Sequence, residues 1–358
     1  MKYIYPLSLL LLLISCQKEE KKVIDRTKAD WAFYKLEGDV KNVTTKSWLV
    51  NDKLEKIKTQ HEDMSMHDGD MVFDENGLLV SEKLYINEKP FEERTYKGRE
   101  KKQQILQYIS GNVGIKTDYG WDQSDKNNTS ITRRNPDNTQ IDRIEMKYKD
   151  GKITEKVTYS KQNNPTERIT YINDKKGNVL EELNYQGFEI LQYKFVKKYD
   201  DKNRILSDVS YDKNSKKLYE TIYEYKGNNL IKKYTYDNKG KIEYSEDFTY
   251  DAKGNLLTEL IYEKFDNSKT LNSYTYDKKG NKTQWAVLKN EKPFMKASFK
   301  YDDKGNTTMI SAVDASGKET NKREYAYEYD KTGNWIKKTV MINGTPQYIA
   351  ERQINYID

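Results

Sequence analysis

A turn motif that returns about every 26 residues constrains this chain more than any other feature of its sequence. The motif reads aromatic residue, Asp, two variable residues, Gly and Asn. A fixed period of this length is the signature of a repeat architecture, in which each unit packs against its neighbours. We call the aromatic position the anchor. The twelve anchors are Phe73, Tyr96, Trp121, Tyr148, Tyr171, Tyr199, Tyr225, Tyr250, Tyr276, Tyr301, Tyr329 and Tyr356.

The recurring Asp and Gly are explained by the chemistry of a tight turn. An Asp at the first position of a type I turn accepts a hydrogen bond from the backbone two residues further on. A Gly at the fourth position adopts a positive φ, which lets the chain close a hairpin. Asn203 replaces this Gly in one copy, and Asn is the non-glycine residue that best tolerates such a conformation. A calcium site is disfavoured, because each loop offers a single recurring carboxylate.

Between the turns, apolar and aromatic residues alternate with polar ones. In residues 242–250 the even positions carry Ile, Tyr, Phe and Tyr, with Glu246 as the exception, and the odd positions are polar. This period of two predicts half-buried antiparallel strands. A second, looser turn in the middle of each unit predicts two strands per unit. No segment after residue 30 has a helical period, so we expect little helix.

The repeats therefore predict an all-β fold made of antiparallel β-hairpins, with about 26 residues per unit. We expect one repeat domain over residues 31–358, clearest in 199–358, that forms a long meander sheet twisted or coiled by its right-handed twist. A β-propeller is the alternative, because two units would supply one four-stranded blade. The 30 Tyr residues suit a thin sheet, since a Tyr can bury its ring and keep its hydroxyl in water.

The first 30 residues carry an export signal and a tether. One Lys precedes a short apolar stretch over residues 7–14, as in a signal peptide. The stretch ends in Leu-Ile-Ser-Cys at Cys16, which resembles the lipobox of bacterial lipoproteins. That resemblance implies that residues 1–15 are removed, that Cys16 is acylated and that residues 16–30 tether the protein to the outer membrane. The acidic residues after Lys18 resemble a surface-export signal, and the periplasmic face is the alternative.

The repeats themselves resemble the YD (Rhs-type) repeat family. The resemblance rests on the copies of Tyr-Asp-x-x-Gly-Asn that begin at residues 250, 276, 301 and 329, with weaker copies over about residues 73–358. Residues 36–43 are similar to the lead-in strand of envelope lipoproteins with such repeats. The family implies a cell-envelope protein that often binds carbohydrate, and in large toxins its repeats build a spiralling β shell. We do not expect a toxin, since the chain stops two residues after Tyr356 and no proline follows an Asp.

Composition argues against several classes of function. Basic residues number 63 and acidic residues 57, and they are interleaved; without residues 1–15, which contribute one Lys, the net charge falls from +6 to +5. This balance disfavours nucleic acid as a partner. The two histidines, His61 and His67, match no recurring zinc-ligand spacing. The sequence lacks a nucleophile elbow, a P-loop and a dinucleotide fingerprint. We therefore expect a protein that is not an enzyme and that uses neither a cofactor nor a metal.

Aromatic side chains are the remaining candidates for a binding site. Trp285 and Trp335 sit just after turns in otherwise charged strands, and Trp121 occupies an anchor position. These three could stack on sugar rings, although packing against cross-strand neighbours is the other reading. The sequence thus favours a lipid-anchored protein that binds a glycan or an envelope polymer at the cell surface. The alternative is a protein-interaction scaffold, or a partner or neutraliser of another envelope protein, which captures a chain by strand addition.

Overall fold

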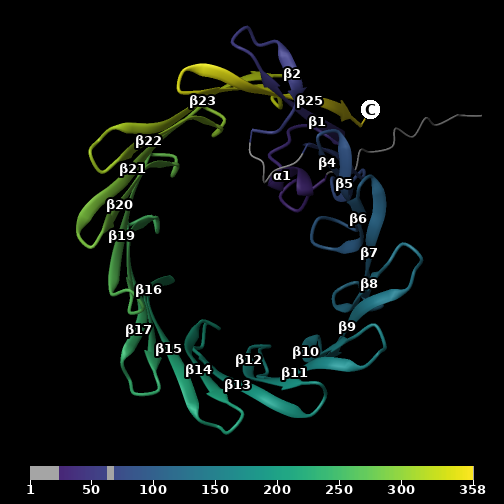
Figure 1. The fold of residues 1–358 in the computed structure, drawn as a ribbon, viewed down its shortest axis with the longest axis vertical. Coiled ribbons are helices and arrows are strands. Elements are labelled where there is room, and N and C mark those ends of the chain that lie inside the picture. Colours follow the sequence, from purple (N-terminus) through teal and green to yellow (C-terminus); the bar gives the residue numbers. More distant parts are fainter. Residues whose placement is uncertain (1–23, 63–67, 358) are drawn as a thin grey trace, which may run out of the picture.

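The computed structural model describes residues 24–62 and 68–357, which form one short helix and 25 strands (Figure 1). The elements are α1 (Asp30–Phe33), β1 (Val40–Val50), β2 (Lys56–Thr59), β3 (Asp68–Phe73), β4 (Leu79–Ile86), β5 (Lys89–Tyr96), β6 (Lys102–Ile109), β7 (Asn112–Trp121), β8 (Asn128–Arg134), β9 (Gln140–Lys149), β10 (Lys152–Tyr159), β11 (Pro165–Asn173), β12 (Val179–Gln186), β13 (Ile190–Tyr199), β14 (Ile205–Asp212), β15 (Lys217–Lys226), β16 (Asn229–Asp237), β17 (Ile242–Tyr250), β18 (Leu256–Glu263), β19 (Ser268–Tyr276), β20 (Lys282–Lys289), β21 (Lys292–Tyr301), β22 (Thr307–Asp314), β23 (Glu319–Tyr329), β24 (Trp335–Ile342) and β25 (Thr345–Tyr356).

The strands form a closed antiparallel ring. From β4 to β24, each strand pairs with the strand before it and the strand after it in the chain, while β3 pairs with the following β4 and β25 with the preceding β24. β1 joins the two ends of this series, because Val43 lies opposite Met71 of β3 on one side and opposite Ile354 of β25 on the other. Of the 25 strands in the described residues, β2 alone stands outside the ring, paired with the C-terminal end of β1. The other 24 strands close the circle seen in Figure 1.

The prediction of a long open meander sheet is therefore wrong, and so is the alternative of a β-propeller. The sheet closes because β-bulges bend its strands. Beside the anchors, the pairing register of adjacent strands shifts by one residue, as between Thr249 and Tyr250 or between Lys300 and Tyr301. Such a bulge sets two residues against one and bends the strand. Repeated in every unit, a bend of about 15° per strand carries 24 strands through a full circle. The hairpin units and the scarcity of helix are as expected.

The turn chemistry inferred from the sequence is confirmed and extended. The Asp251 carboxylate accepts the backbone N–H of Lys253 at 2.8 Å and also that of Asn255 at 2.9 Å. Gly254 has a φ of +88°, and Asn203, which replaces Gly in an earlier copy, has a φ of +63°. The sixth residue of the motif also has a structural role, because the Asn255 side chain donates to the second oxygen of Asp251 at 2.8 Å.

The anchors connect each unit to the preceding one. The Tyr250 hydroxyl donates to the carbonyl of Leu230 at 2.9 Å, and the Tyr276 hydroxyl donates to the carbonyl of Leu256 at 2.8 Å. Each acceptor lies about 20 residues earlier, near the start of the strand after the previous anchor turn. Asn173 holds this place in one unit, with its amide donating to the Ile153 carbonyl at 2.6 Å. The anchor that we assigned to Tyr171 thus lies two residues from the true position.

The hydrophobic core is small and lies at one place on the ring. Its buried side chains include Trp31 and Leu36 from the N-terminal segment, Val43 from β1, and Phe73 and Leu79 from β3 and β4. Figure 1 places α1 inside the ring against these strands. The aromatic side chains of Tyr34 and Phe73 meet edge to face, with centroids 5.9 Å apart. Because Tyr34 belongs to the segment inside the ring of strands and Phe73 is an anchor, the anchors lie on the inner face of the sheet. Elsewhere most strand residues are half-buried.

Candidate ligand site at the seam of the ring

The ring is closed where residues 24–39 meet β1, β3 and β25, a junction that we call the seam. The side chain of Trp31 is fully buried there, and its indole N–H donates to the carbonyl of Val40 at 2.8 Å. One carboxylate oxygen of Asp30 accepts the backbone N–H groups of Leu79 at 2.7 Å and Arg99 at 2.8 Å. These bonds hold the N-terminal segment against the inner face of β4 and the turn after β5.

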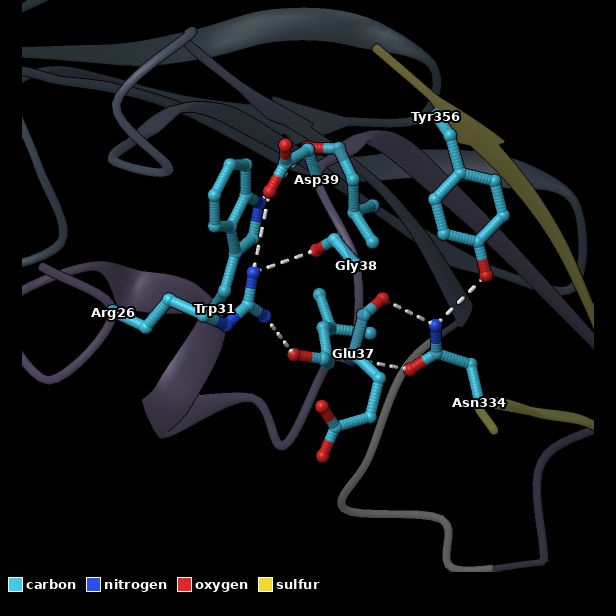
Figure 2. Close-up of polar contacts among 9 residues, drawn as sticks. Arg26, Trp31, Glu37, Gly38, Asp39, Asn334 and Tyr356 are labelled. Atoms are coloured by element: carbon cyan, nitrogen blue, oxygen red, sulfur yellow. Dashed lines mark hydrogen bonds and ion pairs between the residues drawn. The ribbon is translucent and has the colours of Figure 1, made fainter. Parts of the chain in front are cut away.

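Asn334 ties the same segment to the last repeat unit (Figure 2). Its side-chain oxygen accepts the backbone N–H of Glu37 at 2.8 Å, while its amide donates to the Glu37 carbonyl and the Tyr356 hydroxyl, both at 2.8 Å. Asn334 is the sixth residue of the last Tyr-Asp-x-x-Gly-Asn motif. In the turn at Asp251, the equivalent Asn stays within its own turn. The last motif therefore uses its Asn to close the ring.

Arg26 completes the fold of the N-terminal segment. Its guanidinium donates to the carbonyl of Leu36 at 2.7 Å and to the carbonyl of Gly38 at 3.0 Å, and it forms an ion pair with Asp39 at 3.3 Å (Figure 2). The guanidinium carbon also lies 5.1 Å from the centre of a Trp31 ring. The loop between α1 and β1 is thus fixed around one arginine, which shapes the wall of the cavity described next.

A cavity of about 470 Å³ lies between the N-terminal segment and the last units of the ring. We call it the seam cavity. Its volume is in the range of pockets that hold small ligands. One wall comes from residues 26–37, and the other comes from the turns and strands around β23, β24 and β25. Its polar and aromatic lining residues are Arg26, Tyr34, Lys35, Glu37, Lys304, Asn306, Tyr329, Trp335 and Arg352.

Trp335 and Arg352 form one stacked pair in this wall. Trp335 begins β24 opposite Tyr329, and its ring meets that of Tyr327 edge to face at 6.3 Å. The guanidinium carbon of Arg352 lies 3.6 Å from the centre of a Trp335 ring. A stacked guanidinium keeps the N–H donors at its edge available for other partners. The pair therefore offers an aromatic surface and a set of cationic donors to the same cavity.

Arg352 has no anionic partner among the described residues. Its Nε atom is buried without a hydrogen-bond acceptor, and no carboxylate lies within ion-pair distance. Burial lowers the pKa of Arg352 to about 10, an effect that the nearby Tyr327 opposes. The side chain stays charged at neutral pH, because this pKa is still well above 7. It is thus a half-buried cation, with a fully buried Nε atom, in the wall of a cavity.

Lys304 approaches the cavity from the turn after β21. Its ammonium group donates to the carbonyl of Gly333 at 3.2 Å and lies 4.8 Å from the centre of the Tyr329 ring. The Tyr329 hydroxyl bonds to Asp302 and accepts the Asn306 amide at 2.8 Å. Burial and the bond to Asp302 raise the pKa of Tyr329 to about 12, so it remains neutral at physiological pH. The floor of the cavity thus combines one cation with amide and hydroxyl groups.

The three tryptophans selected from the sequence lie in different units and do not form one site. Trp335 lines the seam cavity. Trp285, on β20, donates its indole N–H to the side-chain oxygen of Asn272 at 3.0 Å, and Trp121, at the end of β7, donates to the carbonyl of Lys102 at 2.8 Å. Both are therefore held by neighbouring strands. Cys16, the proposed acylation site, lies outside the described residues.

Sequence reasoning missed Arg352, Asn334 and Lys304. Asn334 and Lys304 belong to repeated motifs, so they looked like ordinary turn residues. The sequence offered one signal for Arg352, which shares a strand face with the anchor Tyr356 and is the one basic residue that stands four residues before an anchor. Among the described residues, no group of three or more His, Cys, Asp and Glu side chains is arranged to hold a metal ion. The same residues contain no helix with the length and apolar character required to cross a membrane.

Comparison with known proteins gives matches in structure alone. No protein-family model matches the chain, and no curated protein does. A chain of the Photorhabdus luminescens Tc holotoxin pore is similar over 81% of this chain, with 12% identity and a TM-score of 0.29. A chain in a crystal structure of TcdB2–TccC3 is similar over 79% of this chain, with 12% identity and a TM-score of 0.28. The present chain covers 20% of the length of each of these two chains.

A porin-like protein from Bacteroides uniformis is also similar, with 9% identity and a TM-score of 0.24. The match covers 88% of this chain and 96% of the porin-like chain.

Proposed function

We propose that this chain is a non-catalytic binding protein of the cell envelope, which holds part of a glycan or envelope polymer in the seam cavity. The observation that carries the proposal is the position of Trp335 in a cavity of about 470 Å³, beside the amide of Asn306 and the ring of Tyr329. Ligand pockets typically combine apolar and aromatic walls with a few polar groups that fix orientation. A sugar presents both an apolar ring face and a rim of hydroxyl groups, so this lining suits it.

The cavity also has the fixed walls that binding requires. Asn334 and Arg26 hold the N-terminal segment in place through hydrogen bonds to Glu37, Leu36 and Gly38. A wall that is ordered before the ligand arrives loses little conformational entropy on binding. The cavity therefore supports selective binding of a short part of a polymer, such as one or two sugar units.

Glycan binding can be tested with the full chain purified in a non-ionic detergent. We expect saturable binding to a subset of bacterial envelope polysaccharides on a glycan array, in competition with free sugar. Trp335→Ala should weaken this binding at least tenfold. Trp285→Ala is the matched control, because Trp285 lies on β20 and does not line the cavity. Equal losses in the two variants would contradict a site at the seam.

The envelope location is a separate part of the proposal and rests on the sequence before residue 30. We propose that Cys16 is acylated and anchors the protein in the outer membrane with the ring outside the cell. Labelled palmitate should be incorporated into the chain, and Cys16→Ser should abolish this incorporation. Proteinase K added to intact cells should degrade the protein if it is surface-exposed. Protection in intact cells, with degradation after outer-membrane permeabilisation, would favour the periplasmic face.

A protein partner is the second candidate, and apolar side chains at hairpin tips favour it. Phe188, Phe265 and Phe294 lie at or beside the turns in the middle of the units and have exposed fractions of 45%, 102% and 48%. Exposed aromatic residues of this kind are enriched in protein interfaces. Few strand edges are free for strand addition, because β2 is the one described strand that pairs with a single neighbour. Replacing the three Phe residues with Ser should abolish co-purification of such a partner and leave glycan binding unchanged.

A further inference from the structure

The seam cavity contains more positive charge than its own acidic residues neutralise. Its lining includes four cations, Arg26, Lys35, Lys304 and Arg352, and one acid, Glu37, which leaves a charge of +3. Asp39 pairs with Arg26 from outside the lining. The ammonium group of Lys304 donates a hydrogen bond to the backbone carbonyl of Gly333 and not to a carboxylate. The excess charge is therefore concentrated on Lys35, Lys304 and Arg352.

Arg352 is the most costly of these cations to leave unpaired. Its Nε atom is buried without an acceptor, a feature that Arg143 shares, but Arg352 also lacks the carboxylate partner that Arg143 and several other arginines on the sheet have. Arg94 pairs with Glu82 at 2.9 Å and also with Glu92, and Arg168 bonds to Glu155 at 2.8 Å. A charged group that is partly buried and has no partner destabilises a fold unless something compensates it. A bound anion would supply the missing compensation.

The geometry of the site suits an oxyanion. Stacking on Trp335 fixes the plane of the guanidinium, so that its N–H donors at the edge keep one orientation. Carboxylate, phosphate and sulfate groups match this edge with two parallel hydrogen bonds. Lys304, which lines the same cavity, supplies a second positive charge. Its ammonium group is a compact point charge, so it can attract an anion without a fixed hydrogen-bond geometry. Asn306, next to the Tyr329 hydroxyl, adds neutral polar contacts for the rest of the ligand.

We propose that the seam cavity binds an oxyanion group on an acidic envelope glycan, with Arg352 as its principal counter-ion and Lys304 as a second. This inference rests on the proposed glycan-binding function and specifies its ligand as acidic. Trp335 has two roles in it, because it orients the guanidinium and lines the space next to the anion. The oxyanion can come from a uronic acid or from a phosphate ester, and these two sources are separate arms of the test.

The first measurement uses simple anions, so that it does not depend on any sugar. The full chain, in detergent and a chloride buffer, is heated with increasing sodium sulfate or sodium phosphate. We expect a saturable rise in melting temperature for the unmodified chain and for Arg352→Lys, and a rise at least fivefold smaller for Arg352→Gln. Arg143→Gln is the matched control: Arg143 also lies over an aromatic ring, Tyr159 at 4.8 Å, but it has Glu145 as a partner at 3.3 Å.

The second measurement compares sugars by calorimetric titration. The probes are a galacturonic acid oligomer, the same oligomer after reduction of its carboxyl groups, and a mannose oligomer carrying a phosphate ester. We expect at least one acidic probe to bind tenfold or more tightly than the neutral oligomer. Arg352→Gln should reduce that ratio to about twofold or less, whereas Arg143→Gln should preserve it. The tighter of the two acidic probes identifies the source of the oxyanion.

The outcomes separate this inference from the proposed function. If acidic and neutral oligomers bind equally well and Arg352→Gln changes nothing, glycan binding stands and the oxyanion site is refuted. If sulfate or phosphate stabilises the chain through Arg352 but no sugar binds, the oxyanion site is supported, and the proposal that the oxyanion belongs to a glycan is wrong. If neither the anions nor the sugars bind the folded protein, both proposals fail. Circular dichroism of each variant verifies that its sheet is intact.

Discussion

At the scale of single residues, closure of the ring depends on a few side chains that depart from the pattern of their repeat. Asn255 and Asn334 occupy the same position of the motif, yet the first completes its own turn and the second reaches Glu37 and Tyr356. Asn334 is also 3% exposed, so its partners cannot easily turn to water when it is lost. A change at this residue should therefore affect the closure of the whole ring.

We expect Asn334→Ala to lower the free energy of unfolding by about 2–4 kcal/mol, because three hydrogen bonds are lost and the backbone N–H and carbonyl of Glu37 lose their partner. Asn255→Ala should cost about 1 kcal/mol or less, since it removes one bond within its own turn. Urea titration followed by circular dichroism measures both. Hydrogen exchange should also show faster exchange at residues 36–43 in the first variant alone. Equal costs would argue against a special role for Asn334.

At the scale of the element, the anchor turn is held by a recurring set of hydrogen bonds that can be predicted from the sequence motif. The Asp carboxylate accepts backbone N–H groups within the turn, and the glycine supplies the positive φ, as at Asp251 and Gly254. Two glycines of this kind differ greatly in their surroundings. A Cβ built on Gly254 would meet nothing within 4 Å, whereas a Cβ on Gly77 would lie 2.5 Å from the Trp31 ring.

This difference predicts unequal effects of the same substitution. Gly254→Ala should cost about 1 kcal/mol, which is the conformational penalty of a positive φ for a residue with a Cβ. Gly77→Ala has the same penalty and must also displace Trp31 from its buried position, so we expect a loss several times larger. Thermal unfolding of the two variants compares them directly. Trp fluorescence should shift to longer wavelength for Gly77→Ala, and an unchanged spectrum would count against this packing.

The turn carboxylates also determine how the protein responds to acid. Hydrogen bonds from Ser124 and from nearby backbone groups hold the pKa of Asp122 down to about 2, and bonds from Asn255 and Asn281 lower the pKa values of Asp251 and Asp277. A pKa lowered by folding contributes stability that is present above the unfolded value, near 4, and is lost as pH falls through the folded value.

We therefore expect the melting temperature to be constant from pH 7 to about 5 and to fall progressively between about pH 4 and pH 2. A series of melts by circular dichroism measures this profile. Replacing Asp251 and Asp277 with Asn, which cannot ionise, should make the profile shallower over the same interval. A melting temperature that rises as the pH drops below 4 would show that these carboxylates are not stabilised by the fold.

At the scale of the whole molecule, a repetitive sheet is closed by a part of the chain that does not repeat. β1 pairs with β25 over residues 42–49 and 348–355, segments about 300 residues apart in sequence. The core lies at this junction, while the rest of the ring relies on strand pairing and on the anchor bonds between units. Disrupting the seam should thus open the ring while the individual hairpins persist.

Closure can be tested by crosslinking. Thr44 lies opposite Gln353 in the pairing of β1 with β25. In a chain with Cys16→Ser, we expect Thr44→Cys and Gln353→Cys to form a disulfide under mild oxidation, which gives a faster band on a non-reducing gel. Thr44→Cys combined with Gln192→Cys, on the distant strand β13, is the control and should remain reduced. Absence of the disulfide in the first pair would show that the sheet is open.

Much of the repeat could be derived from the sequence, because its causes are local. Asp251, Gly254 and the alternation in 242–250 each determine the conformation of a few neighbouring residues, so turns and strands were predictable. Closure was not, since it depends on a small bend summed over 24 strands and on pairing between Val43 and Ile354, which no motif marks. The candidate site was found in part: Trp335 stood out by type, but its partner Arg352 comes from the strand that closes the ring.

The pairing of β1 with β25 also sets the order in which the molecule can mature. A chain made from its N-terminus can form one hairpin after another as each unit becomes available, and such local contacts form quickly. The seam must wait for β25, because residues 42–49 cannot form this pairing until residues 345–356 have been made. Trp335 and Arg352 belong to β24 and β25, and Asn334 immediately precedes β24. The seam cavity is therefore incomplete in every earlier intermediate and forms only when β25 docks on β1.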